Sequence, residues 1–189
     1  MGIHGWPPVN INVPYFKNYS AYNVGFVSAD GSVLVFSAQG KVYDNAALNH
    51  VDLYVSLKAN GKWTEPKSLG PTINTPNLEV TPSLSADSKR LYFSSNALDK
   101  DVSFDVYYAD RLDDTWQNWS KPVNLGPSVN SVGRDYFYRM SPVGAFFSST
   151  QNSDGYADLR FIQSKDTVGS SVDDQSNGRD KSSKLSIRS

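Results

Sequence analysis

The chain has 189 residues, a net charge of −1 at pH 7 and no cysteine, so disulfide bonds and thiolate metal sites are excluded. The near-neutral charge argues against a nucleic-acid binder, which normally carries a basic surface. Hydrophobic residues make up 39% of the chain and aromatic residues 13%, which is enough for one domain with a real core. There is no apolar run of the roughly 18 residues that a transmembrane helix needs.

The N-terminal residues 1–6 lack the basic and apolar regions of a signal peptide. We therefore expect either a cytoplasmic protein or a piece excised from an exported one. Trp6 then begins the first copy of a sequence repeat.

This repeat of about 56 residues runs along the chain and decides the rest of the interpretation. A period of this length is typical of repeat architectures. Residues that recur in all three copies are expected to serve the fold, with each aspartate capping a turn or bonding backbone amides where a strand begins. The recurring residues are Trp6, Trp63 and Trp119 at one position, and Asp52, Asp105 and Asp158 at another.

The second copy shows the predicted elements of one repeat most clearly. Alternating apolar and polar residues predict strands at 79–85, 90–95 and 104–109, with a turn at Asp87 between the first two. A short outer strand is predicted at 122–126, where an edge position tolerates proline. No segment has the 3.6-residue periodicity of a helix.

The predicted fold class is all-β, with three four-stranded antiparallel repeats of the β-propeller type, because such units at this period are what a propeller blade needs. Three strand sets are expected near residues 22–57, 79–109 and 135–163, with fourth strands near 67–69 and 123–125. The blade region is assigned to residues 6–165. Residues 166–189 are polar and predicted to be a disordered tail or linker.

The third strand set has no fourth strand after it, whereas residues 6–10 stand alone before the first set. We expect residues 6–10 to supply an outer strand to the last blade or to a blade of a partner molecule. Propeller rings usually have four to eight blades. The sequence therefore predicts an incomplete arc, a dimer that shares one ring, or a fragment of a longer protein.

Two sets of motifs carry a family resemblance that extends over roughly residues 6–165. Residues 84–95 and 104–107 resemble the TolB-type propeller repeat, the Pro-Asp relative of the WD repeat, and the linkers at 65–75 and 121–131 resemble those of propellers in OmpA-family envelope proteins. The resemblance implies a periplasmic or outer-membrane-associated propeller with protein or glycan partners. This chain shows neither the peptidoglycan-binding domain nor the export signal of that family, which argues against a direct cell-wall role.

Catalytic and metal sites of the common kinds are not expected. The two histidines, His4 and His50, offer neither an oriented catalytic base nor a zinc ligand set. The acidic loop with Asp99, Asp101 and Asp105 does not match the spacing of a twelve-residue calcium loop. We predict no catalytic residue, no metal and no cofactor.

The candidate ligand-binding residues are those that do not repeat. Tyr22, Glu79 and Asp135 each lie six residues before a recurring serine, and Arg134 adjoins the last of them. The first strand of a blade is innermost, so these residues are expected near the mouth of the channel, where a ligand would bind. The alternative is that they are ordinary loop or packing residues.

The sequence thus favours a non-catalytic binding or scaffolding module of the bacterial envelope that presents a loop face or channel mouth to a protein or glycan. A second hypothesis is a glycosidase-like propeller that uses paired carboxylates such as Glu79 and Asp135. A third is a fragment with no function of its own.

Overall fold

The computed structural model describes residues 11, 13, 14, 23–39, 51–96 and 103–164. Over these ranges the chain forms twelve β-strands and no helix, in three antiparallel sheets. No helix in the described part is long and apolar enough to cross a membrane. The all-β, antiparallel part of the predicted fold class is confirmed.

The sheets follow one another along the chain. Sheet I has the order β1-β2-β3-β4, with β5 also pairing with β3; it comprises β1 (Gly25–Val27), β2 (Val33–Gln39), β3 (Val51–Ala59), β4 (Lys62–Trp63) and β5 (Lys67–Ser68). Sheet II has the order β6-β7-β8-β9; it comprises β6 (Glu79–Leu84), β7 (Arg90–Ser95), β8 (Asp105–Asp110) and β9 (Val123–Asn124). Sheet III has the order β10-β11-β12; it comprises β10 (Asp135–Ser141), β11 (Gly144–Ser149) and β12 (Asp158–Gln163).

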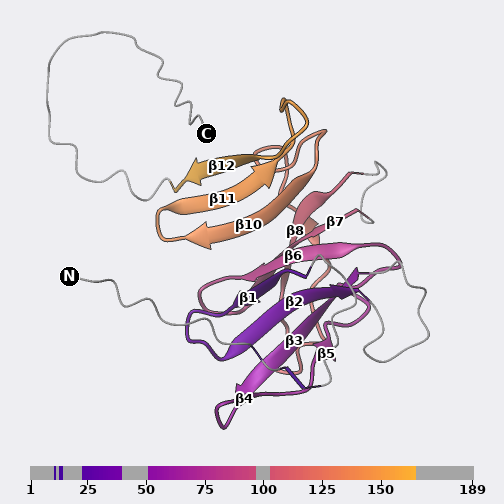
Figure 1. The fold of residues 1–189 in the computed structure, drawn as a ribbon, viewed down its shortest axis with the longest axis vertical. Helices are drawn as coiled ribbons and strands as arrows, with labels where there is room; N and C mark the ends of the chain where they lie inside the picture. The colour runs from indigo at the N-terminus through magenta and orange to yellow at the C-terminus, as the bar shows by residue number, and fades with distance from the viewer. Residues whose placement is uncertain (1–10, 12, 15–22, 40–50, 97–102, 165–189) are drawn as a thin grey trace, which may run out of the picture.

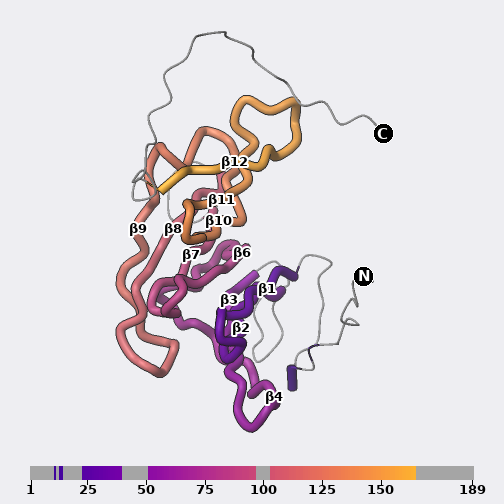
Figure 2. Tube along the Cα trace, turned by 90° about the vertical axis from the view of Figure 1, so that its left-hand side faces the viewer, coloured from indigo at the N-terminus to yellow at the C-terminus, as the bar shows by residue number. Residues whose placement is uncertain are grey.

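The three sheets stack face to face in chain order, with sheet II in the middle (Figures 1 and 2). They do not close into a ring. Residues 6–10 and 166–189, for which the sequence predicts an outer strand and a tail, lie outside the described residues.

Two apolar cores hold the stack together. The larger core joins sheets I and II and the segments that flank their outer strands; it contains Val33, Val35, Leu53, Val55, Leu69, Ile73, Leu84, Leu91, Phe93, Tyr107, Ala109, Trp116 and Trp119. The smaller core joins sheets II and III; it contains Tyr92, Val106, Val129, Tyr138, Ala145 and Phe147. Sheet II is therefore covered on both faces. Successive side chains of a strand point to opposite faces, so strands with apolar residues on both faces need a packing layer on each side.

The recurring Ser-x-Asp turns are local hydrogen-bond structures. Ser28 Oγ donates to Asp30 Oδ1 (2.5 Å) and accepts from the amide of Val33 (2.9 Å). Ser85 makes the same contacts with Asp87 (2.6 Å) and the amide of Arg90 (2.9 Å). These turns set the register of the first two strands in sheets I and II.

Sheet I contains a hairpin that the strand pattern did not predict. Asn60 and Gly61 have φ values of 51° and 77°, and they connect the long strand β3 to β4. An Asn-Gly pair is the preferred sequence for a two-residue hairpin turn, because both positions need positive φ. The hairpin could therefore have been predicted from the Asn60-Gly61 pair, which the strand pattern alone does not reveal.

The inner strands β6 and β10 each contain a β-bulge, at equivalent positions of the repeat. Thr81 and Phe137, which are one repeat apart, have φ values of 51° and 57°, and the pairing register shifts at both positions. Hydrogen bonds then join the two strands: Ser83 Oγ donates to the carbonyl of Tyr138 (2.6 Å), and the amide of Phe137 donates to Thr81 Oγ1 (3.3 Å). The bulges thus tie sheet II to sheet III at their inner edges.

The recurring tryptophans and aspartates occupy different environments. Trp119 is buried and its Nε1 donates to the carbonyl of Trp116 (3.0 Å), whereas Trp63 is half-buried beneath Lys58. Trp6 lies outside the described residues. Asp105 begins β8 and accepts a hydrogen bond from Asn124 (2.9 Å).

The two other recurring aspartates also lie at strand starts. Asp52 is the second residue of β3, and the exposed Asp158 is the first residue of β12. The three aspartates thus fall where the sequence predicts strands to begin.

Candidate functional site

Glu79 is the first residue of β6 and is fully buried. Its carboxylate accepts hydrogen bonds from the amide of Thr75 (2.9 Å), the hydroxyl of Thr75 (2.7 Å) and the hydroxyl of Ser95 (2.9 Å). Burial raises the pKa of Glu79 above 4.5, although these hydrogen bonds oppose the shift. The carboxylate fastens the linker that enters sheet II to the end of that sheet.

Asp135 does the same for sheet III. It is the first residue of β10, fully buried, and it accepts from the amide (2.7 Å) and the hydroxyl (3.0 Å) of Ser131. Thr75 and Ser131 are one repeat apart, as are Glu79 and Asp135. We call each arrangement a linker clamp.

Two of the four candidate ligand-binding residues, Glu79 and Asp135, are the acids of the linker clamps. Neither Glu79 nor Asp135 reaches solvent, so a ligand would contact them only after a clamp opened. Arg134 is exposed, and its amide donates to Thr150 Oγ1 (2.7 Å); Tyr22 lies outside the described residues. Ligand binding at these four positions stays a prediction.

The recurrence of a hydroxyl residue four positions before each acid is the sequence signal for the clamps. Glu79 and Asp135 differ in identity, so the acids alone do not show this repeat.

Each linker also carries an asparagine whose side chain continues the hydrogen bonding of a short outer strand. Asn74 accepts from the amide of Leu53 (2.8 Å) and donates to its carbonyl (3.0 Å). Asn130 does the same with Val106, at 2.8 Å for both bonds, and also donates to Asn124 Oδ1 (2.7 Å). These two asparagines extend the hydrogen bonding of β3 and β8 past the short strands β5 and β9.

A surface cleft of about 470 Å³ lies between the first linker and the outer edge of sheet II. Its volume is in the range of small-molecule sites. Thr75 belongs to both the cleft and a linker clamp. The lining residues are Pro71, Thr72, Thr75, Tyr107, Lys121, Pro122 and Asn124.

Metal chemistry has no evident site in the part of the chain that the structure describes. Within it, no group of three histidine, cysteine, aspartate or glutamate side chains is placed to hold a metal ion. Asp99 and Asp101 of the acidic loop lie outside the described residues.

The outward face of sheet III is apolar and exposed. Phe146, Leu159 and Phe161 have exposed fractions of 39%, 75% and 46%, and the two phenylalanine rings lie 4.6 Å apart. Phe146 lies directly opposite Phe161 in the strand register, and Leu159 lies two residues from Phe161 on the same face. We call these three residues the end face of sheet III.

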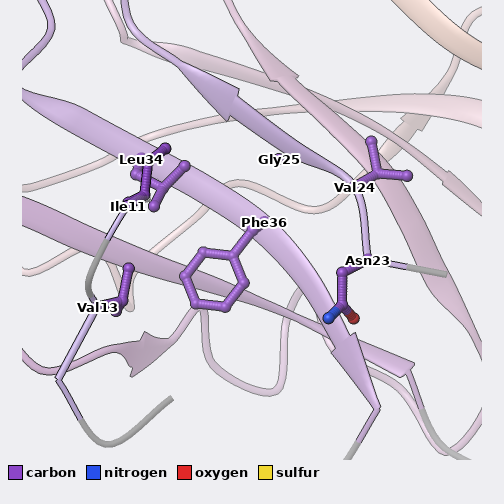
Figure 3. Close-up of a pocket in the computed structure, with 7 residues that line it drawn as sticks. All are labelled: Ile11, Val13, Asn23, Val24, Gly25, Leu34 and Phe36. Atoms are coloured by element: carbon purple, nitrogen blue, oxygen red, sulfur yellow. The ribbon is translucent and has the colours of Figure 1, made fainter. Parts of the chain in front are cut away.

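The opposite end of the stack has a different character. The outward face of sheet I is a buried cluster of Leu34, Phe36, Ala38 and Tyr54, covered in part by Val13. A cavity of about 130 Å³ remains between this face and the chain near its N-terminus (Figure 3). The residues that line it are Ile11, Val13, Asn23, Val24, Gly25, Leu34 and Phe36.

A solved protein structure is similar to this chain at low sequence identity. No family model and no curated protein matches the sequence. Among solved structures, the chain is similar to the crystal structure of TolB from Acinetobacter baumannii, with 14% identity and a TM-score of 0.43. The match covers 80% of this chain and 34% of the TolB chain, so this chain spans about a third of that protein. A similarity of this size identifies neither a partner nor an activity.

Proposed function

We propose that this chain is a non-catalytic binding and scaffolding module, built as an arc of three β-propeller blades. Sheets I, II and III are the blades. The strand order in sheet II, the repeated linker clamps and the face-to-face stacking in chain order support this architecture. It needs no cofactor.

The observation that carries the proposal is the end face of sheet III. Phe146, Leu159 and Phe161 form a contiguous apolar surface on a regular sheet, and such surfaces mark interaction sites in soluble proteins. The chemistry of this face suits a protein partner, because it offers neighbouring aromatic and aliphatic groups beside Arg139 and Ser148, which lie opposite Phe146 and Leu159 in the strand register.

The bacterial envelope is the proposed location. The support is the resemblance of residues 84–95, 104–107 and the two linkers to envelope propellers. A periplasmic or outer-membrane-associated site follows from that resemblance alone.

The glycosidase hypothesis has less support than the binding module. Such an enzyme needs two carboxyl groups that face the scissile bond of a sugar. Glu79 and Asp135 are both buried and hydrogen-bonded to their own linkers. Their geometry suits stabilisation of the blades.

The proposal is tested by immobilising the full chain and its Leu159→Glu variant and passing over each a soluble envelope extract of a Gram-negative bacterium, to which the purified soluble chain has been added. We expect a protein that the wild type retains and the variant does not. Identification by mass spectrometry and repetition with that purified protein complete the test.

Two results would overturn the proposal: equal retention by both proteins, or turnover of aryl glycosides by the wild type that Glu79→Gln abolishes. Selective retention of peptidoglycan fragments would overturn the choice of a protein as the partner.

A further inference from the structure

We infer that the end face of sheet III is the docking surface for sheet I of a second copy of this chain. The inference rests on the proposed function and names the partner. Two joints of this kind already exist within one copy, between sheets I and II and between sheets II and III.

The end face occupies repeat positions that are buried wherever a next sheet exists. By the recurring Phe-Ser and Asp positions, Phe146 corresponds to Tyr92 and Leu159 corresponds to Val106. Tyr92 is 7% exposed and Val106 is fully buried, because sheet III covers them. The same positions in sheet I are Val35 and Leu53, which are fully buried against sheet II.

Sheet I presents the face that such a surface packs against. In the joint between sheets I and II, the receiving face of sheet II includes Phe93 and Tyr107, whose ring centroids are 6.1 Å apart. The corresponding residues of sheet I are Phe36 and Tyr54, whose centroids are 5.9 Å apart. Sheet I therefore carries a receiving face of the same design at the far end of the stack from sheet III (Figure 1).

The receiving face of sheet I is shielded within one copy, where its residues Leu34, Phe36, Ala38 and Tyr54 are 3–8% exposed, so docking of a second sheet requires Val13 to move aside. Val13 shields part of it, Ile11 is 53% exposed, and the cavity of about 130 Å³ lies between them and Phe36 (Figure 3).

Symmetry supports two copies. Each chain has the end face of sheet III at one end of the stack and the receiving face of sheet I at the other. Two chains related by a two-fold axis therefore make two identical joints, and both end faces become buried. The resulting assembly has six blades, within the four to eight that propeller rings usually contain. A single apolar end face on each copy would instead remain open to water.

The test is sedimentation velocity of the full chain from about 1 to 300 µM, the range in which micromolar self-association is visible. We expect a compact dimer, and in Leu159→Glu an increase in the dissociation constant of about 100-fold or more, because the joint would bury an unpaired carboxylate. Tyr156→Glu is the matched control, since Tyr156 is 78% exposed in the loop before β12, and it should remain dimeric. Phe161→Lys is a second variant on the end face. Circular dichroism verifies that all variants fold.

The outcomes separate this inference from the proposed function. A wild type that stays monomeric at every concentration, or a dimer insensitive to both Leu159→Glu and Phe161→Lys, overturns the second copy as the partner. If that monomer still retains an identified envelope protein through Leu159, the proposed function stands and only the partner is wrong. If Leu159→Glu changes neither self-association nor retention, both fail.

Discussion

The linker asparagine Asn130 offers the sharpest test of how the blades are held together. Its side chain makes three short hydrogen bonds, two with the backbone of Val106 and one with Asn124. Val106 is fully buried, so Asn130→Ala leaves its amide without a partner or access to water. The Val106 carbonyl keeps one donor, the amide of Leu125 at 3.1 Å.

The magnitude follows from these contacts. An unpaired buried amide costs about 1–3 kcal/mol, and each further hydrogen bond contributes about 0.5–1.5 kcal/mol. Asn130→Ala is therefore expected to lower the free energy of unfolding by about 2–4 kcal/mol. Since small domains have only about 5–15 kcal/mol in total, the loss is readily measured.

Urea denaturation followed by tryptophan fluorescence and circular dichroism measures the change. Asn74→Ala, which removes the equivalent contacts with Leu53, should cost a similar amount. Asn77→Ala, at an exposed position of the same linker, is the control and should stay within about 0.5 kcal/mol of the wild type. A loss below about 1 kcal/mol for Asn130→Ala would refute the reasoning.

Two further predictions concern the pH dependence of a linker clamp and the packing of sheet III. Because the folded pKa of Glu79 is raised above 4.5, its contribution to stability is complete below that pH and is lost as the pH rises through the folded pKa. Glu79→Gln should therefore gain stability relative to the wild type as the pH rises above 4.5 in urea titrations, and a difference independent of pH would contradict this. Gly144→Ala places a Cβ 2.2 Å from the carbonyl oxygen of Ile162, at a φ of 149°, so we expect a lower midpoint of thermal unfolding, by at least about 4 °C for 1 kcal/mol lost. Gly155→Ala, also at positive φ but with open space around it, is the matched control, and an equal effect in both variants would show that the close contact is not the cause.

The sequence was informative where local patterns decide structure. The predicted strands at 79–85, 90–95 and 104–109 agree with β6, β7 and β8 to within one residue, because alternation and the Ser-x-Asp turns fix them locally. The outer strand predicted at 122–126 is shorter in the structure, Val123–Asn124, because Asn130 replaces part of its hydrogen bonding.

The candidate site was less predictable. A carboxylate at the start of an inner strand looks the same in sequence whether it faces a channel or a linker. Only the contacts of Glu79 with Thr75 and Ser95 distinguish the two, and Ser95 is distant in sequence. Likewise, Leu159 and Val106 occupy the same repeat position, and only the presence or absence of a following sheet makes one exposed and the other buried.

Both proposals require the end face of sheet III to be an interface. Because the chain has no cysteine, Leu159→Cys and Tyr156→Cys each introduce a single thiol, at positions with nearly equal exposed fractions of 75% and 78%. The direct measurement is the rate at which a maleimide labels each thiol over the concentration range of the sedimentation experiment. We expect labelling of the thiol in Leu159→Cys to slow as the chain associates, while the rate in Tyr156→Cys stays constant. Equal and concentration-independent rates at both positions would show that the end face is not an interface.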